Sequence, residues 1–165
     1  MGDCRGDGLT RLLPLLLAII LLLLSLLLLG VLVTPVGAVE GLSMEEAYRE
    51  YARQQAREVG IDPDMLEAQI WAESKFDPNA WAPGGVGIAQ INMAYHDVNA
   101  WDPWASIRYM AKLMASYLEE YNGSWDLALA AYSSGSGTVR RWGGVPPYPS
   151  VRWYISSVRG GVRGD

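Results

Sequence analysis

Apolar residues recur at helical spacing along most of the chain after residue 43, with polar residues between them. A period of about 3.6 residues predicts amphipathic helices rather than strands. The first predicted helix begins at Ser43, which forms a capping box with Glu46, and it ends at Gly60. Its apolar face is expected to comprise Met44, Ala47, Tyr48, Tyr51, Ala52 and Val59.

Two further helices are predicted to begin at Asp-Pro pairs, because Asp is a favoured N-cap and Pro is favoured at the first helical position. One begins at Asp62-Pro63, and the other runs from Asp102-Pro103 to about Tyr121. The apolar stripe of the former is expected to contain Met65, Leu66, Ala68, Ile70 and Trp71. That of the latter is expected to contain Ile107, Met110, Ala111, Met114, Tyr117 and Leu118.

The rest of this region alternates between short helices and Gly- and Pro-rich loops. Short helices are predicted over 124–132, after Gly137 and over 151–158, whereas 76–90 and 143–149 are predicted to be loops. No credible strand and no tandem repeat is visible. The pattern therefore predicts an all-α domain of short helices with long loops.

A Leu-rich run without a charged residue extends from Leu12 to Val33. About 20 apolar residues span a bilayer as a helix, whereas a cleavable signal has an apolar centre of about 7–15 residues. The length favours a retained transmembrane signal-anchor, and the small residues ending at Ala38 favour cleavage; both alternatives stay open. Because Arg5 and Arg11 precede the run and acidic residues follow it, the C-terminal domain is expected to be extracytoplasmic.

Composition limits the partners of this domain. The net charge of −5 argues against a nucleic-acid partner, and the Arg-rich tail is interpreted as a solvated face. The single cysteine, Cys4, excludes a disulfide framework within one chain. We expect no metal and no cofactor, and we expect His96 to be an ordinary loop residue.

Two linked motifs suggest where the chemistry takes place. Residues 72–80 read AESKFDPNA, and residues 84–90 read GGVGIAQ. Glu73 is expected at the end of the second predicted helix, near its apolar stripe. The negative end of the helix dipole and the apolar surroundings both favour a protonated carboxyl group. A general acid that works near neutral pH needs such a raised pKa.

These motifs resemble the signature of the lytic transglycosylase family, of the soluble-lytic-transglycosylase and goose-lysozyme-like type. The resemblance extends over about 44–158. The matching residues are Glu73, Ser74, Phe76, Pro78 and Ala80 in the first motif, and Gly84, Gly87, Ile88 and Gln90 in the second. The family resemblance implies a lysozyme-like fold and cleavage of the MurNAc-GlcNAc β-1,4 bond of peptidoglycan. It also implies that Glu73 acts first as acid and then as base, which gives a 1,6-anhydromuramoyl product without consuming water.

The same resemblance implies the substrate-binding residues. They are Ser74, Gln90, Tyr132, Ser133 and Tyr154, of which Tyr154 is expected near the glutamate. Three positions depart from the family pattern. Ser133 replaces the usual Asn, Ser150-Val151 replace Glu-Thr, and Ala89 replaces Met. These departures bear on sugar recognition and on rate.

We therefore divide the chain into an N-terminal anchor or signal segment (1–38), a linker (39–43) and a catalytic domain (44–165). The expected partners are peptidoglycan glycan strands, the membrane and, by analogy, an envelope-spanning machine. The domain is expected in the periplasm or at the cell surface, or secreted if the chain is cleaved. Three alternatives remain: a hydrolytic muramidase on the same fold, a catalytically silent peptidoglycan-binding scaffold, and a small membrane protein that only docks partners.

Overall fold

The computed structural model describes residues 41–162. The predicted anchor or signal segment, its cleavage position and Cys4 lie outside the described residues, as do the first two residues of the linker. Within 41–162, no helix combines the length and the apolar character needed to cross a bilayer. The described residues from Leu42 onward belong to one compact unit.

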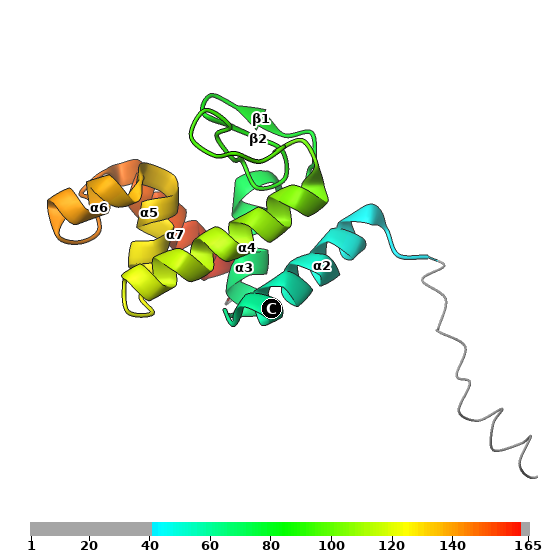
Figure 1. Cartoon of the computed structure of the whole chain (residues 1–165), viewed down its shortest axis with the longest axis horizontal. Helices are drawn as coiled ribbons and strands as arrows, with labels where there is room; N and C mark the ends of the chain where they lie inside the picture. Colours follow the sequence, from blue (N-terminus) through cyan, green and yellow to red (C-terminus); the bar gives the residue numbers. More distant parts are fainter. Residues whose placement is uncertain (1–40, 163–165) are drawn as a thin grey trace, which may run out of the picture. The chain divides into compact units, whose positions relative to one another are not determined.

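The centre of this unit is built from the helices α2 (Met44–Val59), α3 (Pro63–Ser74) and α4 (Pro103–Glu120). Helix α2 packs against both α3 and α4 and joins them into one unit, as Figure 1 shows. The prediction of these helices is confirmed to within a residue or two at their ends.

Local capping explains where these helices begin and end. The hydroxyl of Ser43 accepts from the Glu46 backbone, and the Glu46 carboxylate accepts from the Ser43 backbone, as the capping box predicts. Asp62 and Asp102 each accept hydrogen bonds from two backbone N–H groups of the helix that follows. Helix α2 ends at Gly60, whose φ of 76° lies in the left-handed region.

Three shorter helices complete the helical part: α5 (Trp125–Ser134), α6 (Ser136–Trp142) and α7 (Pro149–Val162). Helix α7 is longer at both ends than the predicted 151–158. It packs against α3 and α5, while α6 packs against α5. Segments about 80 residues apart in the sequence, α3 and α7, are therefore neighbours in the fold.

The expectation that no strand forms was wrong. Two short antiparallel strands, β1 (Trp81–Ala82) and β2 (Gly85–Val86), form a small hairpin at the top of Figure 1. Strands of this length are too short to show the period-two alternation by which strands are recognised. The domain is otherwise helical, so the all-α prediction holds for its main architecture.

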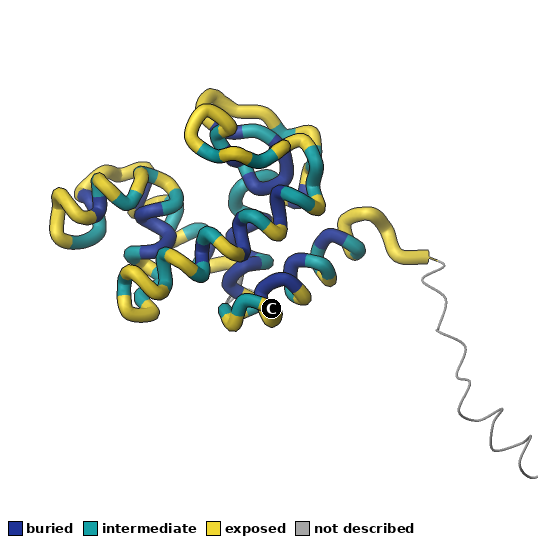
Figure 2. The backbone as a smooth tube through the Cα atoms, in the orientation of Figure 1, coloured by how far each residue is buried: buried dark blue, intermediate teal, exposed yellow. Residues whose placement is uncertain are grey.

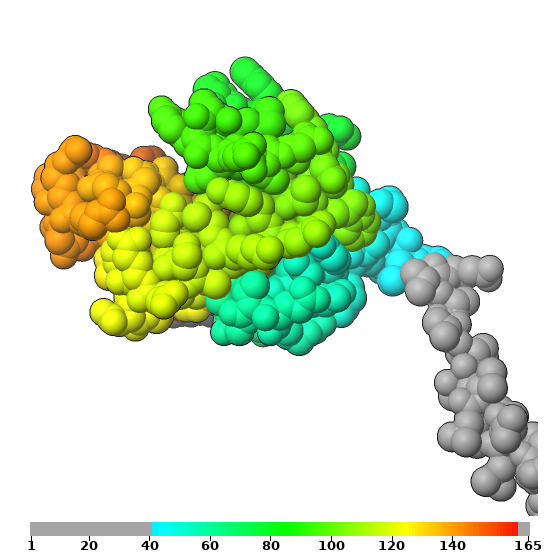
Figure 3. Space-filling view, viewed as in Figure 1, coloured from blue at the N-terminus to red at the C-terminus, as the bar shows by residue number. Residues whose placement is uncertain are grey.

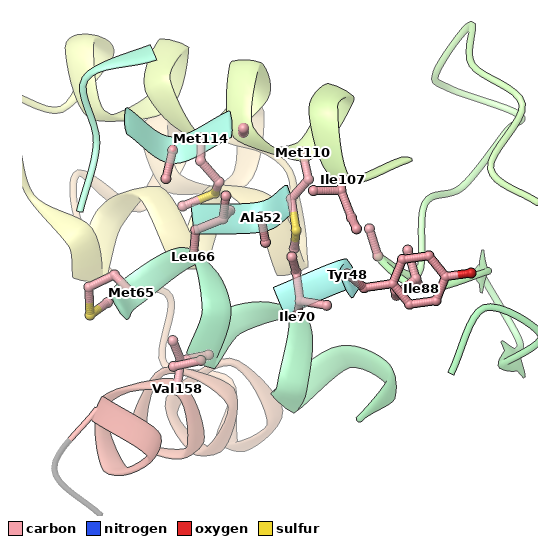
Figure 4. Packing of buried hydrophobic residues seen from close by; sticks show 14 of the residues in the cluster. Tyr48, Ala52, Met65, Leu66, Ile70, Ile88, Ile107, Met110, Met114 and Val158 are labelled. Atoms are coloured by element: carbon pink, nitrogen blue, oxygen red, sulfur yellow. The ribbon is translucent and has the colours of Figure 1, made fainter. Parts of the chain in front are cut away.

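The core lies between α2, α3, α4 and α7, where the tube in Figure 2 is dark blue, and Figure 4 shows its central side chains. Two expected core residues are exposed instead: Met44 is 59% exposed and Trp71 is 43% exposed. Gln69, which was not among the predicted core residues, is completely buried. Helix α3 is covered by α2 on one side and by α7 on another, so a single apolar stripe does not describe it.

Candidate active site

A cleft of about 900 Å³ opens beside the C-terminal end of α3. One wall comes from residues 82–96, which include the hairpin, and the other from residues 131–137 and the start of α7. In Figure 3 the green and orange parts of the surface stand on either side of a notch. The cleft is lined on both sides by small, polar and aromatic residues.

Glu73 lies in the last turn of α3 and lines the cleft. Glu73 is partly buried, and this burial raises the pKa of its carboxyl group from 4.5 to about 7. The hydrogen bond from Tyr154 opposes the increase but does not cancel it. The carboxyl group can therefore exist in both the acidic and the basic form near neutral pH.

Tyr154 is the closest partner of Glu73. Its hydroxyl donates to Glu73 Oε1 at 2.5 Å, and it accepts a hydrogen bond from Gln69 Nε2 at 3.1 Å. The packing of α7 on α3 brings these residues together across a sequence separation of 81. Burial, followed by the nearby Glu73 carboxylate, raises the pKa of Tyr154 well above its usual value, so it remains a neutral donor.

Gln69 is a site residue that the sequence analysis missed. It lies four residues before Glu73, and side chains at that spacing share one face of a helix. A polar residue between the predicted core positions Ala68 and Ile70 was the signal that could have identified it.

The other wall contributes Tyr132 and Ser133, which both line the cleft. The Tyr132 hydroxyl donates to the backbone oxygen of Ala89 at 2.6 Å and thereby links α5 to the opposite wall. Burial raises the pKa of Tyr132 well above its usual value, and the Glu73 carboxylate adds to the effect. The Ser133 hydroxyl donates to the Ala130 carbonyl at 3.5 Å, in the preceding turn of α5.

Ser74 and Gln90 make hydrogen bonds within the fold. The Ser74 hydroxyl donates to the Ile88 carbonyl at 2.6 Å, and Ser74 is not among the lining residues. Gln90 does line the cleft, and its Nε2 donates to the carbonyl groups of Ala80 and Gly87 at 3.1 and 2.9 Å. These bonds fix the shape of the hairpin wall, and direct contact with a substrate stays a prediction for both residues.

Gly87 explains why the second motif is rich in glycine. It has a φ of 72°, and a Cβ atom on it would lie 2.0 Å from the backbone oxygen of Ala100. Only glycine fits this position without displacing the chain. The hairpin wall is therefore packed closely against the backbone of Ala100 at this point.

His96 lies in an irregular segment, as expected, but it also lines the cleft. Its Nδ1 lies 2.9 Å from the Tyr109 hydroxyl. Within the part of the chain that the structure describes, no three His, Cys, Asp or Glu side chains gather as metal ligands would.

Among the described residues that line the cleft, Glu73 is the only carboxylate. Most glycosidases place two carboxyl groups about 5–9.5 Å apart on either side of the scissile bond. The arrangement here instead suits chemistry in which a single carboxyl group donates and accepts the proton.

Comparisons with known proteins identify the family and the fold of this domain. The family model of the transglycosylase SLT domain matches residues 50–147, which is more than half of the chain. The chain is 34% identical over 105 residues to membrane-bound lytic murein transglycosylase F 1 of Alkalilimnicola ehrlichii, a match that covers 56% of this chain and 21% of that protein. The chain thus spans about a fifth of the length of this relative.

The fold is similar to that of the lytic transglycosylase Slt from Pseudomonas aeruginosa, whose structure is that of an inactive mutant. The TM-score is 0.62 at 21% sequence identity, and the match covers 69% of this chain and 23% of that chain. At this identity the similarity establishes the fold, which is the predicted lysozyme-like one.

Proposed function

This chain belongs to the transglycosylase SLT domain family, and on that premise we propose that it is a peptidoglycan lytic transglycosylase. The proposed reaction cleaves the β-1,4 bond between N-acetylmuramic acid and N-acetylglucosamine. The single observation that carries the proposal is the Glu73 carboxyl group, which lines the cleft with a pKa of about 7.

In the first step, protonated Glu73 donates its proton to the glycosidic oxygen. The bond from that oxygen to C1 of the muramoyl sugar breaks, and the electron pair leaves with the oxygen. In the second step, the Glu73 carboxylate accepts the proton of the muramoyl 6-hydroxyl as its oxygen bonds to C1. The product is a 1,6-anhydro ring, no water is consumed, and Glu73 is protonated again.

Two opposing effects support both roles of Glu73. Poor hydration favours the protonated form, which the first step uses, and the hydrogen bond from Tyr154 favours the carboxylate, which the second step uses. Because the resulting pKa is about 7, the protonated and ionised forms of Glu73 have similar free energies at neutral pH.

We assign the binding of the glycan strand to residues on both walls. Gln90 lies on the hairpin wall, and Tyr132 and Ser133 lie on the wall from α5. Ser74 supports the hairpin wall through Ile88 and is retained as a predicted substrate contact. The substitution of Ser for Asn at 133 shortens the side chain, so we expect a weaker hold on the sugar there.

The test is mass spectrometry of muropeptides released from purified peptidoglycan. We expect 1,6-anhydromuramoyl ends from the wild-type chain. For Glu73→Gln we expect a rate lower by about 10²–10⁴-fold with peptidoglycan binding retained. Glu119→Gln, an exposed carboxylate on α4, is the matched control and should leave the rate unchanged.

Other results would assign a different function. Reducing ends in place of anhydro ends would identify a hydrolytic muramidase. If both the wild-type chain and Glu73→Gln bind peptidoglycan and neither cleaves it, the protein is a catalytically silent scaffold. A chain with no affinity for peptidoglycan would contradict the whole proposal and favour a docking role.

We further propose that residues 1–38 tether the domain to a membrane with residues 44–165 on the extracytoplasmic side, where peptidoglycan lies. The support is the apolar run from Leu12 to Val33 with arginines before it, and the membrane-bound character that the relative's name gives to that protein. A role within an envelope-spanning machine remains an analogy. Fractionation of cells and protease treatment of spheroplasts test the topology, because a cytoplasmic domain would be protected.

A further inference from the structure

We propose that Gln69 is a positioning residue that fixes the direction of the hydrogen bond between Tyr154 and Glu73. The inference deepens the proposed function and rests on it for its catalytic meaning. The hydrogen-bond geometry itself does not depend on which reaction takes place.

The geometry forms a chain of donors that ends at Glu73. Gln69 is completely buried on α3, one helical turn before Glu73. Its Nε2 donates to the Tyr154 oxygen at 3.1 Å, and the Tyr154 hydroxyl donates to Glu73 Oε1 at 2.5 Å. A phenol has one hydrogen to donate, so an oxygen that accepts from Gln69 directs that hydrogen to Glu73.

Met114 holds the amide of Gln69 in this orientation. Its thioether sulfur lies 3.4 Å from Gln69 Nε2 and can only accept. If the amide were reversed, its oxygen would face that sulfur without a donor, and its nitrogen would no longer donate to Tyr154. The Tyr154 hydrogen could then turn to the amide oxygen and leave Glu73. The sulfur therefore favours the orientation in which Tyr154 serves the carboxylate.

The buried amide has a cost in stability that an apolar residue would avoid. Gln69 Oε1 is buried and has no hydrogen-bond partner among the described residues. A buried polar atom without a partner is destabilising, whereas Met or Leu would fill the same space without it. A purely structural residue at this junction of α3, α4 and α7 would be apolar, so the amide points to a role in the site.

Among the described residues, Tyr154 is the only ionisable group that is hydrogen-bonded to Gln69, whose other partner is Met114. Besides Tyr154, the ionisable groups that line the same cleft are Tyr132 on α5, Tyr117 on α4, and Tyr95 and His96 in the irregular segment. On the α2 side of α3, Arg49 is paired with Glu45 and Glu67. An effect of Gln69 on the titration of Glu73 therefore passes through Tyr154.

The experiment measures the Glu73 carboxyl directly, by 13C NMR of the 165-residue chain labelled at glutamate carboxyls, in mild detergent and without substrate. Glu73→Gln identifies the resonance. We expect Gln69→Met to raise the pKa of Glu73 by about half a unit, and Tyr154→Phe to raise it by at least that much. In the Tyr154→Phe background, Gln69→Met should have no further effect. The thermal midpoint of Gln69→Met should not fall below that of wild type.

Three results would overturn the inference. One is an unchanged pKa of Glu73 in Gln69→Met. Another is a shift in the double variant that equals the sum of the single shifts, because Gln69 would then act by another route. The third is loss of the native near-ultraviolet dichroism in both Gln69→Met and Gln69→Leu, which would make the residue structural.

The proposed function fails in a different way. A chain that releases no anhydromuropeptides, but whose Glu73 titration responds to Gln69→Met, would refute the transglycosylase reaction and leave the positioning role intact. Anhydro products together with an unresponsive titration would overturn the positioning role alone. With an active chain, Gln69→Met should also move the alkaline limb of the pH–rate profile upward by the same half unit.

Discussion

Replacing Glu73 by Gln removes a titrating group from a poorly hydrated position and keeps its shape. The amide oxygen can still accept the hydrogen bond from Tyr154. In the wild-type chain the pKa is about 7 when folded and about 4.5 when unfolded. Between these values the native state holds a proton that the unfolded state releases, so the free energy of unfolding falls as the pH rises through this window.

The size of the effect follows from the two pKa values. A rise from 4.5 to about 7 corresponds to about 3 kcal/mol at roughly 1.36 kcal/mol per unit. Below about pH 4.5 both states are protonated and the penalty is absent; above about pH 7 it is present in full. Glu73→Gln should therefore match wild type at pH 4 and exceed it by about 3 kcal/mol at pH 8. The midpoint of thermal unfolding at pH 8 should rise by on the order of 10 °C.

The assay is urea unfolding of both chains from pH 4 to pH 8.5, followed by tryptophan fluorescence, with Glu119→Gln as control. The dependence on urea should be the same in all chains, so that differences report stability. A stability gain of equal size at every pH would show that the change is unrelated to ionisation. The absence of any gain at pH 8 would show that the Glu73 carboxylate is well hydrated, and the reasoning on its acid role would fail with it.

Three further predictions concern the rate and the cleft walls. The rate should fall about tenfold per pH unit above about pH 7, where Glu73 loses its proton; a rate that holds to pH 9 would contradict this. Gly87→Ala should lower the free energy of unfolding by at least about 2 kcal/mol in urea titrations, while Gly84→Ala, which also has a positive φ but faces open space, should lower it by only about 1 kcal/mol. Tyr132→Phe should lower it by about 1–3 kcal/mol, because the buried Ala89 carbonyl loses its donor; an unchanged urea midpoint would show that this bond does not hold the walls together.

The helix ends could be predicted from the sequence because capping is local. Ser43, Asp62 and Asp102 act within three residues of their own position, so the printed sequence contains all the partners. The apolar face of α4 was also predictable, because this helix buries one face, and Ile107, Met110, Ala111 and Met114 follow it at helical spacing.

Which side chains of helix α3 are buried could not be predicted from the sequence in the same way. It is covered on more than one side, so the exposure of Trp71 depends on the position of α2, whose Arg49 guanidinium lies 5.1 Å from the indole ring. The burial of Gln69 depends on Tyr154, which is 85 positions away. Neither of these long-range contacts produces a periodic pattern of apolar and polar residues in the sequence.

The position of Tyr154 beside Glu73 was available only from the family resemblance. No pattern of polar and apolar residues indicates that the start of α7 returns to the end of α3. The structure supplies the distance and the direction of the bond, which the motifs alone do not contain.

The two walls of the cleft differ in the contacts that join them to the rest of the domain. The hairpin wall is joined to the end of α3 by the Ser74–Ile88 bond and to α5 by the Tyr132–Ala89 bond, with Gly87 packed beneath it. The opposite wall, formed by residues 131–137 and the start of α7, contributes short side chains to the cleft at 133–137 and at 150. A library of variants aimed at a new glycan preference should therefore be concentrated on 133–137 and 150, which line the cleft and leave out the buried Val139 and Pro146, since randomising 84–90 would mostly yield unfolded chains.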